Sequence, residues 1–282
     1  MQSQRMDRRE FLQSGLVAAS LIAAGRLPLL ARDADGGSGI DAGGQPCAVK
    51  PIRDYLPTFS PSDTQGQERP ATLHYDIVHW SWGRKGRGTH TNSVVGKIDI
   101  ACTKSSDRIV YEVAQSTKVG GVDNVMEAEI ACNTDALHSI RSWRLKSHEV
   151  GPDGQIDPLS KLAERGRCEN GKIRIESDRD HCGRLASHCV VTQWHVPGLL
   201  TRSADRSLRL TFDLLRDASL LKPNQRLTYD GRVQVPVKGG RTLALDSYAQ
   251  TGEGILPTHY LLDDKRRVQL VTCSFLSWAL QR

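Results

Sequence analysis

The chain of 282 residues carries 38 Lys and Arg against 32 Asp and Glu, and only 5% of its residues are aromatic. The first 32 residues contain five arginines and two acidic residues, so the remainder has 33 basic against 30 acidic residues and a net charge of about +3. That balance is ordinary for a globular protein, and no nucleic-acid partner is expected from it. The length allows one large domain or two small ones.

The N-terminus has the features of an export signal. Residues 7–13 read DRREFLQ, and an apolar run follows from Leu16 to Ala24. This run is too short for a membrane-spanning helix, which needs about 20 apolar residues. The pair Arg8-Arg9 resembles the twin-arginine export signal of bacteria, a receptor-read address. The resemblance implies export in the folded state to the periplasm or the medium, with residues 1–32 as the signal peptide.

Residues 33–69 differ in composition from the rest of the chain. They are rich in Gly, Asp, Ser and Pro, which bury too little apolar surface to offset the entropy of ordering. We therefore predict a disordered linker over 33–69 and a single β-rich domain over 70–282. No further segment is apolar enough to span a membrane once the signal is removed.

Apolar and polar residues alternate through much of the predicted domain, which is typical of strands with one face on the core and one in water. The sequence therefore predicts a mainly β fold: an open, curved antiparallel sheet or half-barrel with one or two short helices. Glu127 and Glu129 fall on the wet face of one such strand. The expected strands cover residues 73–78, 97–102, 109–113, 126–132, 137–146, 172–176, 189–195, 226–237, 241–249, 256–262 and 268–276.

Two segments suggest helices instead. Leucines at helical spacing favour a short helix over Phe212–Leu221, which Lys222-Pro223 would end. A second short helical stretch is expected near Leu159–Arg165.

The C-terminal quarter carries a second resemblance. From Phe212 to Trp278 the chain reads as a helix-like FDLL stretch, a Leu-Lys-Pro break, strands, and a GEGILPTHYLLDD hairpin before a closing strand. This order resembles uncharacterised exported bacterial proteins built on an open, curved antiparallel sheet. Related open architectures include periplasmic lipoprotein carriers, although no carrier residue can be matched here, and a fold likeness alone does not establish function.

The densest cluster of metal-ligand residue types is His181, Cys182, His188 and Cys189. Imidazole and thiolate together suit zinc or copper, and these four residues are the candidate metal ligands. Their spacing is not that of a known zinc module. The competing interpretation is a disulfide across a loop, Cys182 to Cys189 or Cys168 to Cys182, since cysteines of exported proteins usually pair.

The chain has seven cysteines, so at least one stays unpaired or pairs between chains. Cys102 and Cys132 both fall on the predicted inward face of their strands. A cross-strand disulfide between them and two buried thiols are both compatible with that placement.

The sequence contains no nucleophile elbow, no zinc-protease helix motif and no phosphate-binding glycine loop. No catalytic residue or cofactor is expected on this basis, and whether the protein is an enzyme stays open. The favoured hypothesis is a non-enzymatic binding or interaction module of the cell envelope. Its concave, aliphatic sheet face would hold an apolar ligand or the surface of an envelope protein. The alternative hypothesis is a metal-dependent periplasmic enzyme that uses the His/Cys cluster.

Overall fold

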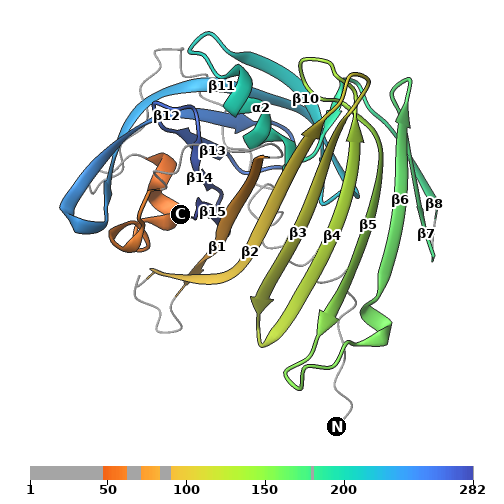
Figure 1. The fold of residues 1–282 in the computed structure, drawn as a ribbon, viewed down its shortest axis with the longest axis horizontal. Helices are drawn as coiled ribbons and strands as arrows, with labels where there is room; N and C mark the ends of the chain where they lie inside the picture. Colours follow the sequence, from red (N-terminus) through yellow and green to blue (C-terminus); the bar gives the residue numbers. More distant parts are fainter. Residues whose placement is uncertain (1–46, 62–70, 83–89, 179–180, 282) are drawn as a thin grey trace, which may run out of the picture. The chain divides into compact units, whose positions relative to one another are not determined.

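The computed structural model describes residues 47–61, 71–82, 90–178 and 181–281 (Figure 1). The predicted signal peptide lies outside the described residues, as do both ends of the predicted linker. The described residues belong to one compact unit. None of the helices in these ranges is long and apolar enough to cross a membrane.

The predicted fold class is confirmed, because the strands form one open sheet in which neighbours are antiparallel except for the parallel pair β9–β10. The strands are β1 (Ala71–Trp82), β2 (His90–Lys104), β3 (Ile109–Val119), β4 (Val122–Cys132), β5 (Ile140–Val150), β6 (Leu162–Glu169), β7 (Lys172–Ser177), β8 (His181–Leu185), β9 (Val190–Val191), β10 (Arg209–Arg216), β11 (Leu220–Val237), β12 (Arg241–Thr251), β13 (Thr258–Leu262), β14 (Val268–Thr272) and β15 (Leu276–Leu280). The helical elements are η1 (Cys47–Ile52), η2 (Leu56–Thr58), η3 (Pro158–Ser160), α2 (His195–Ser203) and η4 (Lys238–Gly240).

The strand order requires the sheet to curl. The order runs from β8 down to β1 and continues from β15 down to β9, so β8 and β9 are the two edges. Fifteen strands laid flat would span roughly 70 Å. Only residues 186–189 separate β8 from β9, and such a connection reaches about 18 Å at most. The two edges must therefore approach each other at this connection, and the open sheet is curled.

Hydrogen bonds hold the connection between the two edges. The Ala186 amide donates to the Gly171 carbonyl beside β7, and the Asp213 amide of β10 donates to the Cys189 carbonyl. The buried Asp213 carboxylate also accepts hydrogen bonds from the Ser187 and His188 amides, at 2.7 and 3.2 Å. The connection is thus anchored to both ends of the sheet.

The first half of the sheet, β1 to β8, has one apolar and one polar face, as the alternation predicts. Tyr111, Ile130 and Trp143 are in register on the inner face and are buried. Glu127 and Glu129 point outward and are exposed. In Figure 1 these long strands lie side by side.

In the second half, β10 to β15, strands β13 to β15 are covered on both faces, while β11 keeps alternate side chains exposed. On one face α2 contributes Val196 and Leu200 to a cluster with Tyr248 and Tyr260. On the other face the segment containing η1 and η2 packs against β1 and β11–β15, and its own apolar side chains are buried. These are Ala48, Val49, Ile52, Leu56 and Phe59.

This packing corrects the predicted linker. Residues 47–59 of the expected disordered segment are part of the folded unit, since their five apolar side chains supply the outer cover of the second half. Lys238 also donates its amide to the Phe59 carbonyl at 3.0 Å.

The predicted helix over Phe212–Leu221 is wrong. The segment is the end of β10, a turn, and the start of β11, with Asp217 and Ala218 at positive φ in the turn. The described α-helix is α2, which begins at His195, the last residue of the strand expected over 189–195, and continues through a segment where no helix was expected. The helical turn expected near Leu159 is the short η3, and β6 begins at Leu162.

Candidate functional site

The structure does not bring the predicted metal ligands together. His181 and Cys182 are consecutive in β8, so their side chains point to opposite faces of the sheet. His188 and Cys189 lie in the connection beyond β8 and are exposed. Among the residues that the structure describes, no three His, Cys, Asp or Glu side chains form a group that could hold a metal ion. The metal site therefore has no geometric support.

The predicted disulfides are not formed, because all seven cysteines are free. For Cys102 and Cys132 the reason is the strand order. Cys102 pairs in register with Tyr111 of β3, and Cys132 pairs with Ile109 on the other side of β3. Two strands separated by a third lie about 9.6 Å apart, beyond the reach of a disulfide. The Cys182–Cys189 bond is also absent, with Cys182 packed against the core and Cys189 exposed.

A buried polar cluster lies instead where α2 meets β3 and β4. His195 Nε2 is 3.4 Å from Cys132 Sγ, and the His195 and Tyr111 ring centroids are 4.5 Å apart. The Tyr111 hydroxyl is 2.6 Å from His138 Nδ1. Arg202, near the end of α2, donates to Cys102 Sγ at 3.3 Å. The helix approaches so closely that a Cβ on Gly198 would lie 3.2 Å from the Tyr111 ring.

Hydrogen bonding fixes the protonation of the Cys132–His195 pair. His195 Nδ1 accepts the Thr192 amide at 3.1 Å, so the ring proton is on Nε2 and points to the Cys132 sulfur. The ring cannot then remove a proton from the thiol. Burial lowers the pKa of His195 to about 3 and raises the pKa of the Cys132 thiol. Both groups are neutral, and this arrangement is that of a structural contact rather than an activated nucleophile.

Sequence reasoning missed this cluster. Cys132 and His195 are 63 positions apart, and His138 occupies a turn with positive φ rather than a strand. The available signal was the pattern of β4, which places Cys132 inward with Met126, Ala128 and Ile130. That pattern predicts burial but does not name the partner.

Away from α2, the inner face of the first half is apolar but slightly more accessible. Along β4 the exposed fraction rises from 0% at Cys132 and Ile130 to 7% at Ala128 and 8% at Met126. The row containing Ala128 continues in register to Val113 on one side and Leu145 on the other. This end of the interior therefore has an aliphatic lining several strands wide.

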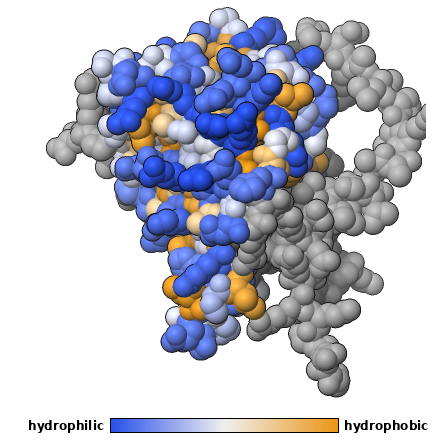
Figure 2. All heavy atoms as spheres, turned by 90° about the vertical axis from the view of Figure 1, so that its right-hand side faces the viewer, coloured by the Kyte–Doolittle hydropathy of each residue, from blue (hydrophilic) through white to orange (hydrophobic). Residues whose placement is uncertain are grey.

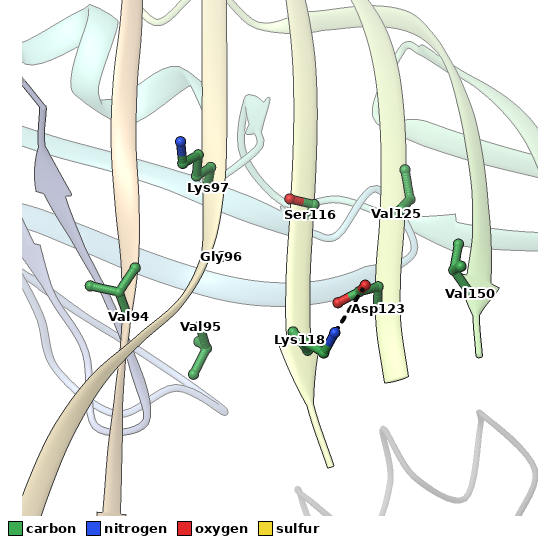
Figure 3. Close-up of a pocket in the computed structure, with 9 residues that line it drawn as sticks. All are labelled: Val94, Val95, Gly96, Lys97, Ser116, Lys118, Asp123, Val125 and Val150. Carbon is green, nitrogen blue, oxygen red and sulfur yellow. Dashed lines mark hydrogen bonds and ion pairs between the residues drawn. The ribbon is translucent and has the colours of Figure 1, made fainter. Parts of the chain in front are cut away.

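A separate groove lies on the polar face of the same strands (Figure 3). It has a volume of about 380 Å³ and forms where β2 bends at a bulge next to Gly96. Its floor is apolar, with Val94, Val125 and Val150, and the Lys118–Asp123 ion pair lies at its side with 3.5 Å between Nζ and Oδ2. Any ligand in it would lie outside the curled sheet.

The bend itself depends on a close backbone approach. A Cβ on Gly96 would overlap the Ser116 carbonyl oxygen of β3, so a side chain at this position would displace one strand from the other.

No protein-family model matches the sequence, and no curated protein matches it. Among solved structures, the chain is similar to the crystal structure of a DUF1089 family protein from Pseudomonas aeruginosa. The sequences are 13% identical, the TM-score is 0.32, and the match covers 67% of this chain and 93% of that chain. At this level of similarity the match supports no conclusion about function.

Proposed function

We propose that this protein is a non-enzymatic binding module of the cell envelope that holds an apolar ligand inside its curled sheet, at the end away from α2. The observation that carries the proposal is the large number of strands in the curled sheet compared with the few elements that pack on its inner face. In closed sheets of eight strands side chains alone fill the interior, while 16 or more strands leave a channel. Here 15 strands curl around an interior in which α2 lies at one end.

The chemistry of the lining agrees with an apolar ligand. Val113, Ala128 and Leu145 form one row across three strands, and Met126 lies in the next row. The polar side chains at this end include Gln115, which donates to Thr117 Oγ1 at 3.5 Å, and the carboxylate of Glu164, which is opposite Leu145 and accepts from Trp143 Nε1 at 3.4 Å. Ligand sites are typically apolar with a small number of such orienting groups.

The test fills the proposed site. Ala128→Trp in the full-length chain should weaken binding of an uncharged fluorescent naphthylamine probe by at least about tenfold, since a bulky ring takes the ligand's volume. Ala114→Trp is the matched control, because Ala114 is exposed on the outer face of the adjacent β3. Ala128→Leu, a smaller increase in volume, serves if the Trp variant does not fold.

Equal probe binding by the wild type and all three variants would reject the interior site. Elemental analysis of the same preparation tests the metal-dependent alternative. One metal ion per chain, lost on changing His188 and Cys189, would favour that alternative over a binding module.

The envelope location rests on the N-terminal sequence and has its own test. Changing Arg8 and Arg9 to Lys should leave the protein in the cytoplasm as a full-length precursor, because the paired arginines are what the twin-arginine receptor reads. Normal periplasmic amounts of this variant would reject twin-arginine export while leaving the ligand site untouched.

A further inference from the structure

The outer face of the first half is divided by charge. On β3 and β4 its exposed charges are mainly acidic and include Glu112, Glu127 and Glu129. On β5 to β7 they are mainly basic. We define the basic surface as Arg144, Arg165, Arg167, Lys172 and Arg174. The two regions meet between β4 and β5, where Glu129 is directly opposite Arg144.

One row of the basic surface lacks any carboxylate. Across β5 to β8 the row reads Ser142, Arg167, Arg174 and Gly183, so two guanidinium groups are directly opposite each other. Like charges in that position destabilise a sheet. Glu169 forms an exposed ion pair with this row, with 3.8 Å between its Oε1 and Arg167 Nη1.

The other acidic group of this surface is already engaged. Glu176 Oε2 accepts from both Arg165 Nε and Nη2 at 2.8 Å. With Glu169 and Glu176 counted against its five cations, the basic surface keeps a clear positive excess.

The surface also has a shallow groove and an exposed leucine. The groove, of about 220 Å³, is lined by Arg167 and Glu169 of β6, Asn170 of the β6–β7 turn, and Lys172 and Arg174 of β7. Leu185, at 76% exposure, is directly opposite Lys172 across the β7–β8 pair. Figure 2 views the side of the molecule that carries β7 and β8, and hydrophilic residues cover most of it.

We propose that the basic surface docks the protein onto an anionic phospholipid bilayer, with lipid phosphates between Arg167, Lys172 and Arg174. Arginine forks suit phosphate oxygens, and clustered cations are attracted to anionic leaflets. An exposed leucine among cations suits the boundary between headgroups and acyl chains. This inference goes beyond the interior ligand site and does not depend on it.

The chemistry of the surface argues against single-stranded nucleic acid as the occupant. Proteins that bind it combine basic grooves with aromatic side chains on which bases stack. Between residues 140 and 185 the sole Phe, Tyr or Trp is Trp143, which is buried on the opposite face.

The experiment is cosedimentation of the full-length chain with vesicles. Wild type should bind vesicles of equal parts phosphatidylglycerol and phosphatidylcholine, should bind pure phosphatidylcholine vesicles far less, and should release as salt is raised. Arg167→Glu with Arg174→Glu should weaken binding to the anionic vesicles by roughly 30-fold or more. Leu185→Ser should weaken it a few fold.

The matched control is Arg209→Glu with Arg226→Glu, which changes the net charge equally on exposed positions of β10 and β11. This control should bind like wild type. Equal loss in both double variants, or no loss in the first, would overturn the proposal. The proposal would also be overturned if wild type bound single-stranded DNA as tightly as it binds the vesicles and the Arg167→Glu, Arg174→Glu variant lost that DNA binding. A wild type that binds both vesicle types equally would also overturn it.

Discussion

The two halves of the sheet differ in how many of their faces are covered by other parts of the chain. Strands β1 to β8 are mostly long, and their outer face meets water with charged side chains. Strands β13 to β15 have five residues each and lie between two layers, with α2 on one face and the η1–η2 segment on the other. All five residues of β14 are buried.

This difference in burial indicates that the two regions have different roles, one in stability and one in binding. A strand that is buried on both faces has no side chain free to meet a partner, so β13 to β15 serve stability. The first half has a polar outer face and an apolar inner face, and both proposed interactions use it. Breaking each half separately should therefore give different phenotypes.

The largest expected effect compares two buried leucines. Leu270→Ala in β14 should lower the free energy of unfolding by about 3–5 kcal/mol, because Leu270 is fully buried between layers. Leu145→Ala in β5 should cost about 2 kcal/mol, because its site is less tightly enclosed at 5% exposure. Urea denaturation followed by circular dichroism measures both. A larger loss for Leu145→Ala would reverse the assignment of the second half as framework.

The next effect concerns pH at the junction of the halves. Burial, with a contribution from the Arg202 cation, lowers the pKa of His138 to about 4, and burial lowers that of His195 to about 3. The unfolded chain takes up these protons near pH 6.5, before the folded chain does. Stability should therefore be full above about pH 6.5 and fall as the pH drops towards 4, by up to about 1.4 kcal/mol per pH unit for each histidine.

Denaturation at a series of pH values compares the wild type with His138→Gln. The variant should lose less stability on acidification, because one of the two buried imidazoles is gone. An unchanged slope would show that His138 is not a neutral group of the folded state.

A smaller effect tests close packing within the first half. A Cβ on Gly166 of β6 would overlap the Trp143 ring, so Gly166→Ala should cost about 1–3 kcal/mol. At Gly183 of β8 the nearest atom to an added Cβ is 3.8 Å away, and Gly183→Ala should be close to neutral. Thermal melts of the two variants provide the comparison, and equal melting temperatures would contradict it.

The smallest effect is expected on the outer face. Arg165→Ala removes the exposed ion pair with Glu176 and should change stability by no more than about 0.5 kcal/mol. Denaturation in low and high salt measures it. A loss above about 1 kcal/mol would mean that the outer charges of the first half are part of its framework.

The sequence by itself determined β1 to β5 and β7 of the first half, whereas β6 and β8 were not among the expected strands. Alternation of apolar and polar residues can be read from a short stretch of sequence. A strand with one buried face and one exposed face shows the same alternation in its burial, as β4 does. The same rule correctly placed Glu127 and Glu129 in water and Cys102 and Cys132 on the inward face. It also gave the mainly β, open-sheet fold class.

Only the tertiary structure decided two segments whose apolar side chains do not alternate with polar ones. In β10 the run Phe212 to Leu215 is buried at every position, so period two disappears and the leucines resemble a helix. The same cause hid the role of residues 47–59, whose apolar side chains have no period of their own. Burial on two faces does not always mislead, because the strand predicted over 268–276 contains β14, which is buried at every position.

Pairings between distant residues were also a tertiary matter. The sequence shows that Cys102 and Cys132 face inward, but the strand order places β3 between them. The four His and Cys residues from 181 to 189 are close along the chain, yet strand geometry and the anchored connection separate them. Cys132 and His195 meet because α2 packs into the curled sheet, a contact that depends on where β8 and β9 approach each other.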